Sequence, residues 1–187
     1  SQDGASSSLM APSGNSQKAV MQAALKAAAI DSDNIDVVEA HGTATGLGDP
    51  TELNALLEVF CRTPRTKPLL VGSVKTNFGH MEASAGIIGF IKLLLALRNE
   101  YLPQHLNYSE GHPDIDWANE AIEVCAQGRP WPKAQRRRVA GLSGFGFSGT
   151  NAHVVVAEAP RIAEAAAVAP IEHQPLLLLL SAATPTS

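Results

Sequence analysis

Residues 83–97, with the sequence ASAGIIGFIKLLLAL, form the segment that most constrains the fold of this chain. The segment has the length of a helix and is apolar almost all round. A helix without a polar face belongs inside a protein rather than on its surface. We therefore expect a layered protein with this helix in its interior.

Helical patterns and short apolar runs alternate along the rest of the chain. Ser16 is positioned to cap a helix at residues 17–29, and Asp49 to cap a second helix that ends at Glu58. Pro50 then falls at the first helical position and Glu52 at the third, a capping-box arrangement with Asp49 as the cap. Strands are predicted at residues 35–40, 68–73, 121–126, 138–143 and 152–158. The last two strands could pair across a glycine-rich turn, so the order indicates a mixed α/β fold with helices covering a sheet.

Composition limits the size and class of the protein. The 187 residues, 45% of them hydrophobic, suit one compact domain or one lobe of a larger unit. A net charge of −4 argues against a nucleic-acid partner, which would favour a basic face. The one basic run, at residues 136–138, is interpreted as the solvated start of a strand.

The cysteines and apolar runs indicate a cytoplasmic location. Cys61 and Cys125 form no disulfide framework and no metal-binding CxxC motif, which fits a reducing compartment. The run from Leu176 to Leu180 is far shorter than the roughly 20 residues of a membrane span, so no membrane partner is expected.

The two ends of the chain differ in composition from its middle. Residues 1–15 are polar and predict a loop, and because the chain starts there without Met we expect a fragment of a longer protein. Residues 1–160 are expected to form the domain. Residues 161–187 are Ala/Pro-rich and predict a linker, followed by a strand-like LLLLLSA segment.

The segment VEAHGTATGLGDPTE, residues 38–52, contains the first candidate site. His41 comes at the carboxyl end of a predicted strand, the edge where α/β proteins bind ligands. The glycines that follow leave room for a substrate. Thr43 and Thr45 offer hydroxyls to a polar, uncharged ligand such as an amide chain. The other interpretation is a loop histidine beside an ordinary helix cap.

The segment VGSVKTNFGH, residues 71–80, repeats this pattern. His80 is predicted at a helix start, which disfavours the imidazolium, and a neutral imidazole can donate a hydrogen bond to a developing oxyanion. Lys75 could orient a neighbouring histidine or pair with Glu52. Alternatively, it is a surface lysine.

The segment SGFGFSGTNAH, residues 143–153, formally matches GxGxxG. A strand-like run follows it instead of a helix, so no helix N-terminus would bind a pyrophosphate, and we reject a dinucleotide site. Phe145 and Phe147 instead suit a loop that lines an apolar channel. His153 is interpreted as structural. No Cys/His spacing in the chain predicts a metal site, and neither cysteine lies in an activating motif.

Together, the three segments resemble the C-terminal half of a β-ketoacyl synthase. More narrowly, they are similar to the ketosynthase domain of a modular type I polyketide synthase, over residues 1–160. The resemblance implies a thiolase-like, layered αβαβα fold made of two similar halves, of which this chain is the second. It also implies a homodimer, and a linker toward an adjacent acyltransferase domain.

The resemblance implies decarboxylative Claisen condensation of an acyl thioester with malonyl or methylmalonyl on an acyl carrier protein. His41 and His80 match the two catalytic histidines, and Lys75 matches the supporting lysine with Glu52 as its partner, on the helix that Asp49 begins. The remaining matches are Thr43 and Thr45, for the phosphopantetheine arm of the carrier protein, and Phe145 and Phe147, for the loop that gates the acyl tunnel. No cofactor is bound directly.

The chain departs from the family pattern at two places. The nucleophilic cysteine of the family is missing, so we expect it in the N-terminal half, upstream of Ser1, and we expect this fragment alone to be inactive. Ala44 stands where many members have glycine. One alternative function is a non-elongating module that binds or transfers acyl groups, or acts as a scaffold. The other alternative is an unproductive truncated product, which would expose apolar surface meant for the missing half.

Overall fold

The computed structural model describes residues 1–3, 12–118 and 121–160. Its main sheet has five strands in the order β4-β2-β1-β6-β7. The strands are β1 (Val37–Glu39), β2 (Leu69–Gly72), β4 (Ile122–Val124), β6 (Val139–Phe145) and β7 (Asn151–Ala157). The first four in spatial order are parallel, whereas β7 pairs antiparallel with β6. The short strands β3 (Tyr101–Leu102) and β5 (Arg129–Pro130) form a separate pair.

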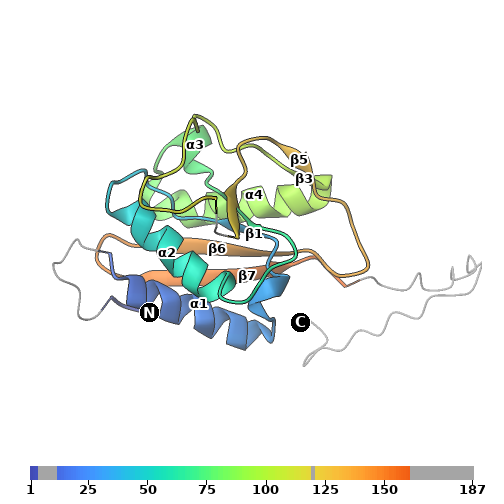
Figure 1. Ribbon diagram of the computed structural model, residues 1–187, viewed down its shortest axis with the longest axis horizontal. Coiled ribbons are helices and arrows are strands. Elements are labelled where there is room, and N and C mark those ends of the chain that lie inside the picture. Colours follow the sequence, from blue (N-terminus) through green and yellow to red (C-terminus); the bar gives the residue numbers. More distant parts are fainter. Residues whose placement is uncertain (4–11, 119–120, 161–187) are drawn as a thin grey trace, which may run out of the picture.

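Helices cover both faces of the main sheet. The helices are α1 (Gly14–Ala28), α2 (Gly48–Phe60), α3 (Lys75–Phe78) and α4 (Ala85–Asn99), with 3₁₀ turns at Ser32–Asn34 and Glu82–Ser84. The helices α1 and α2 pack on one face and α4 on the other (Figure 1). Successive residues of β1 separate accordingly, because Val38 packs with α1 and α2 whereas Val37 packs with α4.

The mixed α/β fold and the pairing of β6 with β7 are confirmed, but the starts of α1, α2 and α4 differ from the predictions, and α4 begins at Ala85 rather than Ala83. The helix α1 begins at Gly14 and is capped by Ser13, whose side chain accepts the N–H of Ser16. The helix α2 begins at Gly48, directly after its cap residue Leu47, and the hydroxyl of Thr45 accepts the N–H of Gly48 at 3.1 Å. Asp49 is therefore not the cap of α2 and lies in its first turn.

The interior position predicted for α4 is wrong for the described residues. The helix buries Leu93 and Ala96 against the sheet. The opposite side of α4 is apolar and exposed to solvent, and we call it the bare side. Its residues Ile87, Ile91, Leu94 and Leu95 have exposed fractions of 43–56%. A groove of about 520 Å³ runs along this side, between Phe78 and Tyr101. The sequence shows that both sides of α4 are apolar. It does not show whether the elements that cover each side belong to this chain or to another part of the protein.

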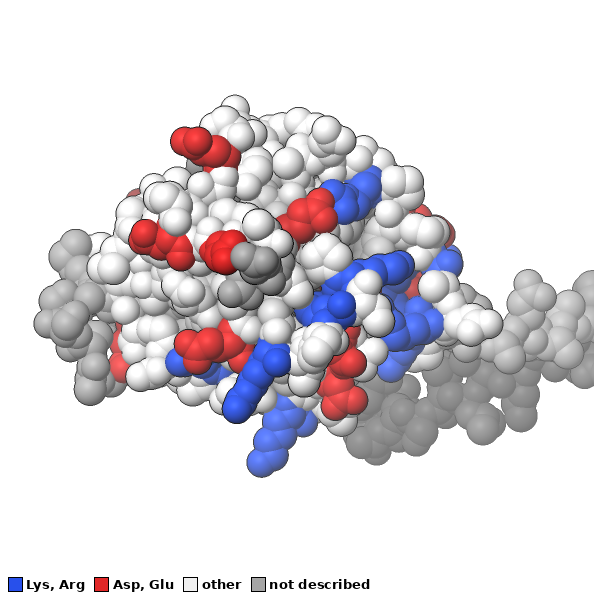
Figure 2. Space-filling model, in the orientation of Figure 1, with Lys and Arg blue, Asp and Glu red and all other residues white. Residues whose placement is uncertain are grey.

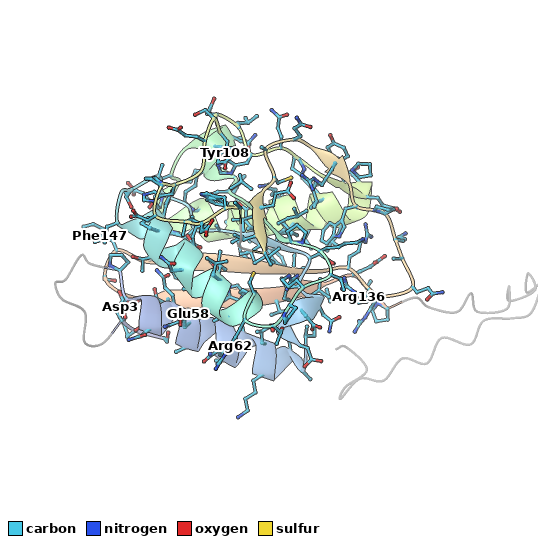
Figure 3. All side chains as sticks on the ribbon, viewed as in Figure 1. Asp3, Glu58, Arg62, Tyr108, Arg136 and Phe147 are labelled. Carbon is cyan, nitrogen blue, oxygen red and sulfur yellow. The ribbon has the colours of Figure 1, made fainter. Side chains whose placement is uncertain are left out.

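The basic run before β6 is only partly solvated. Figure 2 shows basic side chains gathered toward the end of the molecule where Arg136 lies in Figure 3. Arg136 pairs with Asp36. Arg138 is 3% exposed, pairs with Glu158 at 3.0 Å and lies over the ring of Trp131, so the solvated position predicted for it is wrong.

No helix in the described ranges is long and apolar enough to cross a membrane. The strand predicted near residue 176 lies outside the described residues, as does the predicted linker at residues 161–187.

Candidate active site

Three loops meet at the carboxyl edge of the sheet. They connect β1 to α2, β2 to α3, and β6 to β7, and β1, β2 and β6 are parallel, so these strand ends lie at the same edge. The rings of His41 and His80 lie edge to face with centroids 5.5 Å apart. The ring of Phe145 is 5.6 Å from that of His41. The fold thus brings together residues from all three sequence segments.

Glu52 of α2 holds the loop that carries His41. Its carboxylate is buried and accepts the backbone N–H of His41 at 2.8 Å and that of Gly42 at 2.9 Å. Gly42 has a φ of +46°, and a Cβ added there would lie 3.0 Å from Cβ of Ser73, so glycine suits this position for two reasons. The predicted capping box is wrong because Glu52 binds the preceding loop rather than the start of its own helix.

The backbone fixes the orientation of both imidazoles. The N–H of Phe145 donates to Nδ1 of His41 at 3.4 Å, and the N–H of Glu82 donates to Nδ1 of His80 at 2.9 Å. In a neutral imidazole whose Nδ1 accepts a hydrogen bond, the proton is on Nε2. Each neutral ring therefore keeps an Nε2–H that can donate to a ligand.

His80 does not lie at a helix start. The helix α4 begins at Ala85, after the 3₁₀ turn Glu82–Ser84. The sequence suggested that the dipole of a long helix acts on this ring, and the position of His80 does not support that. The N–H of Glu82, from the 3₁₀ turn, orients it instead.

Burial keeps the imidazole of His41 neutral. Burial, followed by the charge of Lys75 and the interaction with His80, lowers the pKa of His41 to about 4. Burial also lowers the pKa of Lys75, whereas Glu52, Glu39 and Asp49 oppose that shift. At neutral pH, His41 is thus a hydrogen-bond donor without a charge of its own.

Lys75 and Glu52 do not form the ion pair suggested by the sequence within the described ranges. Both oxygens of Glu52 are used by the N–H groups of the His41 loop. Burial raises the pKa of Glu52 to about 7, and those two N–H groups oppose the rise. Glu52 therefore influences Lys75 only through space.

The threonine loop is tied to the start of α2. The hydroxyl oxygens of Thr43 and Thr45 are 3.3 Å apart, and Asp49 accepts the N–H of Ala44 at 3.1 Å. Ala44 has a φ of 57°, in the left-handed region that favours glycine. Thr45 borders a cavity of about 410 Å³ that Tyr108 also lines, and Tyr108 is labelled in Figure 3.

The two phenylalanines of the glycine-rich turn have different surroundings. Phe145 is half-buried against His41, whereas Phe147 is 76% exposed (Figure 3). His153 is buried on β7, with its Nδ1 3.1 Å from the hydroxyl of Ser143. Burial raises the pKa of the Cys125 thiol, which disfavours a nucleophilic thiolate.

A buried ion pair that was not predicted from the sequence lies beneath the site. Glu39, at the end of β1, is 2% exposed, and its Oε2 lies 2.6 Å from Nζ of Lys92 on α4. His105 was missed as well, and its Nδ1 accepts the N–H of Ser73 at 3.0 Å. A signal for the pair existed, because one acid ends an apolar strand and one lysine interrupts an apolar helix. Such isolated opposite charges in buried elements are expected to pair.

Family comparison agrees with this geometry. The model of the β-ketoacyl synthase C-terminal domain matches residues 1–109, and that of the ketoacyl-synthetase C-terminal extension matches residues 112–187. Erythronolide synthase EryA2 of Saccharopolyspora erythraea is 51% identical over 180 residues, which are 96% of this chain and 5% of that protein. Phenolphthiocerol synthesis polyketide synthase Pks15/1 of Mycobacterium marinum is 51% identical over 160 residues, which are 85% of this chain and 8% of that protein.

Solved ketosynthases share the fold. The ketosynthase from module 6 of the bacillaene synthase of Bacillus subtilis superimposes with a TM-score of 0.81 at 37% identity, covering 86% of this chain and 29% of that structure. Ketosynthase twelve of the bacillaene synthase of Bacillus amyloliquefaciens gives a TM-score of 0.82 over the same shares. The chain thus spans only a small part of the curated relatives and under a third of these ketosynthases.

Proposed function

Because the chain belongs to the β-ketoacyl synthase family, we propose that it supplies the two-histidine half of a condensing active site. The reaction is decarboxylative Claisen condensation of an acyl thioester with malonyl or methylmalonyl on an acyl carrier protein. Loss of CO₂ leaves an enolate whose carbon attacks the acyl carbonyl. A C–C bond forms, and the thiolate that held the acyl group leaves.

One observation carries this proposal: each of two adjacent imidazoles has its Nδ1 bound to a backbone N–H. Both Nε2–H groups can then donate to thioester oxygens as these gain negative charge. Preorganised donors of this kind stabilise an oxyanion without reorganising during the reaction. A neutral His41 also avoids protonating the carbanion as a strong acid would.

Lys75 supports this chemistry electrostatically. Its charge is among the causes of the low pKa of His41. Glu52 fixes the His41 loop, and Asp49 fixes the threonine loop through the N–H of Ala44. Lys75, Glu52 and Asp49 thus act through their neighbours.

The remaining predicted residues serve binding in this proposal. Thr43 and Thr45 hydrogen-bond the phosphopantetheine arm of the carrier protein, which is a substrate carrier rather than a resident cofactor. Phe145 and Phe147 line the acyl channel. The exposure of Phe147 is consistent with a side chain that an acyl chain or another part of the protein would cover.

The proposed partners follow from what this chain lacks. The nucleophilic cysteine comes from the N-terminal half of the ketosynthase, and the bare apolar side of α4 is the surface that this half would cover. The complete domain is a homodimer that works with acyl carrier protein and an adjacent acyltransferase domain. Residues 161–187 are proposed as the linker to that domain. The isolated chain is expected not to condense.

The test uses the complete ketosynthase that contains this chain, with malonyl on its carrier protein as substrate. His41→Ala and His80→Ala should each slow release of CO₂ by about 10²-fold or more, the cost of losing an oxyanion donor. Lys18→Met, in a surface ion pair between α1 and α2, is the control and should retain activity. Undiminished CO₂ release by both histidine variants would overturn the proposal. If no product is longer than the starter, the non-elongating alternative holds.

A further inference from the structure

The buried pair Glu39–Lys92 joins three elements beneath the site. One carboxylate oxygen of Glu39 lies 2.6 Å from Nζ of Lys92 on α4. The other oxygen accepts the backbone N–H of Val74, in the loop between β2 and α3. The side chains of Glu39 and Lys92 are 3% and 14% exposed, so both charges are held largely away from water.

The close approach of α4 to the sheet brings Lys92 to this position. A Cβ added to Gly89 would lie 2.9 Å from a methyl carbon of Leu142 and 3.1 Å from Cγ of Glu39. Gly89 therefore lets α4 pack directly on β1 and β6. Lys92, three residues later, lies on the same side of the helix.

The N–H that Glu39 accepts immediately precedes Lys75. The neighbouring N–H, of Ser73, donates to Nδ1 of His105, and that of Lys75 donates to the hydroxyl of Ser73 at 3.4 Å. Ser73 also lies close to Gly42, in the loop that carries His41, because a Cβ added to Gly42 would be 3.0 Å from Cβ of Ser73. A shift of Glu39 would therefore move Lys75 and the residue against which the His41 loop packs.

We propose that Glu39, held by Lys92, is a positioning residue that fixes Lys75 beside His41 and His80. This inference rests on the proposed function. A buried ion pair adds little net stability compared with apolar residues of similar volume, so stability alone does not account for it. A role in position does account for this ion pair, because it links α4 rigidly to Val74, in the loop that immediately precedes Lys75. We call this segment the Lys75 loop.

The charge of Glu39 also acts on Lys75. The charged groups that bear on Lys75 are Glu52 and Asp49 from α2 and Glu39 from β1, and Lys75 in turn bears on His41. Glu39 is one of the carboxylates that oppose the effect of burial on the pKa of Lys75. Loss of this charge should let Lys75 deprotonate at lower pH.

The test compares Glu39→Gln, the double variant Glu39→Gln/Lys92→Met and the control Glu158→Gln in the complete ketosynthase. The control breaks the Arg138–Glu158 pair, whose side chains are 4% and 13% exposed and which lies away from the site. The measurements are thermal melting, and kcat and KM for CO₂ release from malonyl carrier protein across pH 6–10. The double variant leaves no buried unpaired cation, so it keeps the test valid if Glu39→Gln alone unfolds.

We expect both Glu39 variants to lower kcat about tenfold with an unchanged KM. In Glu39→Gln, the alkaline limb of the pH profile should also move down by about half a unit to one unit. The control Glu158→Gln should have a lower melting temperature. Its kcat and the pH of its alkaline limb should equal those of the wild type. A folded double variant with wild-type kcat and pH profile would overturn the inference. His80→Ala, assayed in parallel, separates the two proposals: if it is also fully active, the proposed function fails too.

Discussion

The two faces of the central sheet are completed to different degrees. On the face covered by α1 and α2, Phe60 and Met21 are fully buried, and the outer surface carries ion pairs such as Lys18–Glu58. In Figure 3, Glu58 and Arg62 mark this side of the molecule. On the other face, α4 packs against the sheet but exposes a second apolar side. The face under α1 and α2 is finished, in the sense that its apolar residues are covered within the described residues. The face under α4 is unfinished, because the outer side of α4 exposes apolar residues as an interface does.

Both faces nevertheless hold the site, each through a buried carboxylate. Glu52 reaches the His41 loop from α2 and is satisfied by two N–H groups. Glu39 reaches the Lys75 loop from the α4 side and is satisfied by one N–H and one ammonium. The proposed N-terminal half would therefore contact the same helix, α4, that carries Lys92.

The largest effect is expected on the finished face. Phe60→Ala removes a fully buried ring from between α2 and the sheet, so it should cost about 3–5 kcal/mol of unfolding free energy. Because its neighbours are all internal, this loss should be the same in this chain and in the complete ketosynthase. Urea unfolding of both proteins measures it. A much smaller loss in the chain alone would show that this face, too, needs a partner.

Leu94→Ala sharpens the contrast, because Leu94 is 45% exposed on α4. In this chain the substitution should change the unfolding free energy by no more than about 0.5 kcal/mol. In the complete ketosynthase, where the proposed N-terminal half covers α4, the loss should rise to about 2–5 kcal/mol. The same urea experiment checks both values. Equal small losses in the two proteins would refute the proposed interface.

Glu52→Gln tests how the finished face holds the site. A glutamine can accept one of the two N–H groups, but its own NH₂ would oppose the other, so we expect a loss of about 1–3 kcal/mol. The pH dependence of stability should change as well. The folded pKa of Glu52 is about 7, above its ordinary value of 4.5, so its contribution is complete below pH 4.5 and is lost as pH rises through 7.

His41 has the opposite dependence. Its folded pKa of about 4 lies below the ordinary 6.5, so acidification from pH 6.5 to 4 destabilises the fold. Burial lowers the pKa of His153 to about 4 as well, so both histidines make stability rise with pH up to 6.5, and Glu52 opposes that rise in the wild type above pH 4.5. In Glu52→Gln, unfolding free energy should therefore rise more steeply with pH between 4.5 and 6.5, as measured by urea midpoints. An unchanged pH profile would mean that Glu52 does not titrate as its burial predicts.

The pairing of His41 with His80 was implied by the family resemblance, whereas the residues alone placed only His41 at the carboxyl end of a strand. The structure brings the two rings together at the carboxyl edge of the parallel strands. The use of Glu52 could not be predicted, because its position in the helix is equally compatible with a capping box. Nor could the sequence identify which side of α4 is exposed. An apolar helix side is expected to be covered, but its composition does not show which part of the protein covers it.

The smallest effect is expected between the two faces, at Ala44. A left-handed conformation costs a residue with a Cβ about 1–2 kcal/mol, and the greater freedom of glycine in the unfolded chain returns about 0.5–1 kcal/mol of that. Ala44→Gly should therefore stabilise the fold by up to about 1 kcal/mol, measured as a rise in melting temperature. Ala29, with a φ of 51° at the end of α1, offers a matched control on the finished face. If both glycine variants stabilise equally and keep wild-type KM for malonyl carrier protein, the methyl group of Ala44 only strains the loop. A change in KM for Ala44→Gly alone would show that this methyl group bears on the carrier arm, and would make Ala44 a determinant of substrate binding.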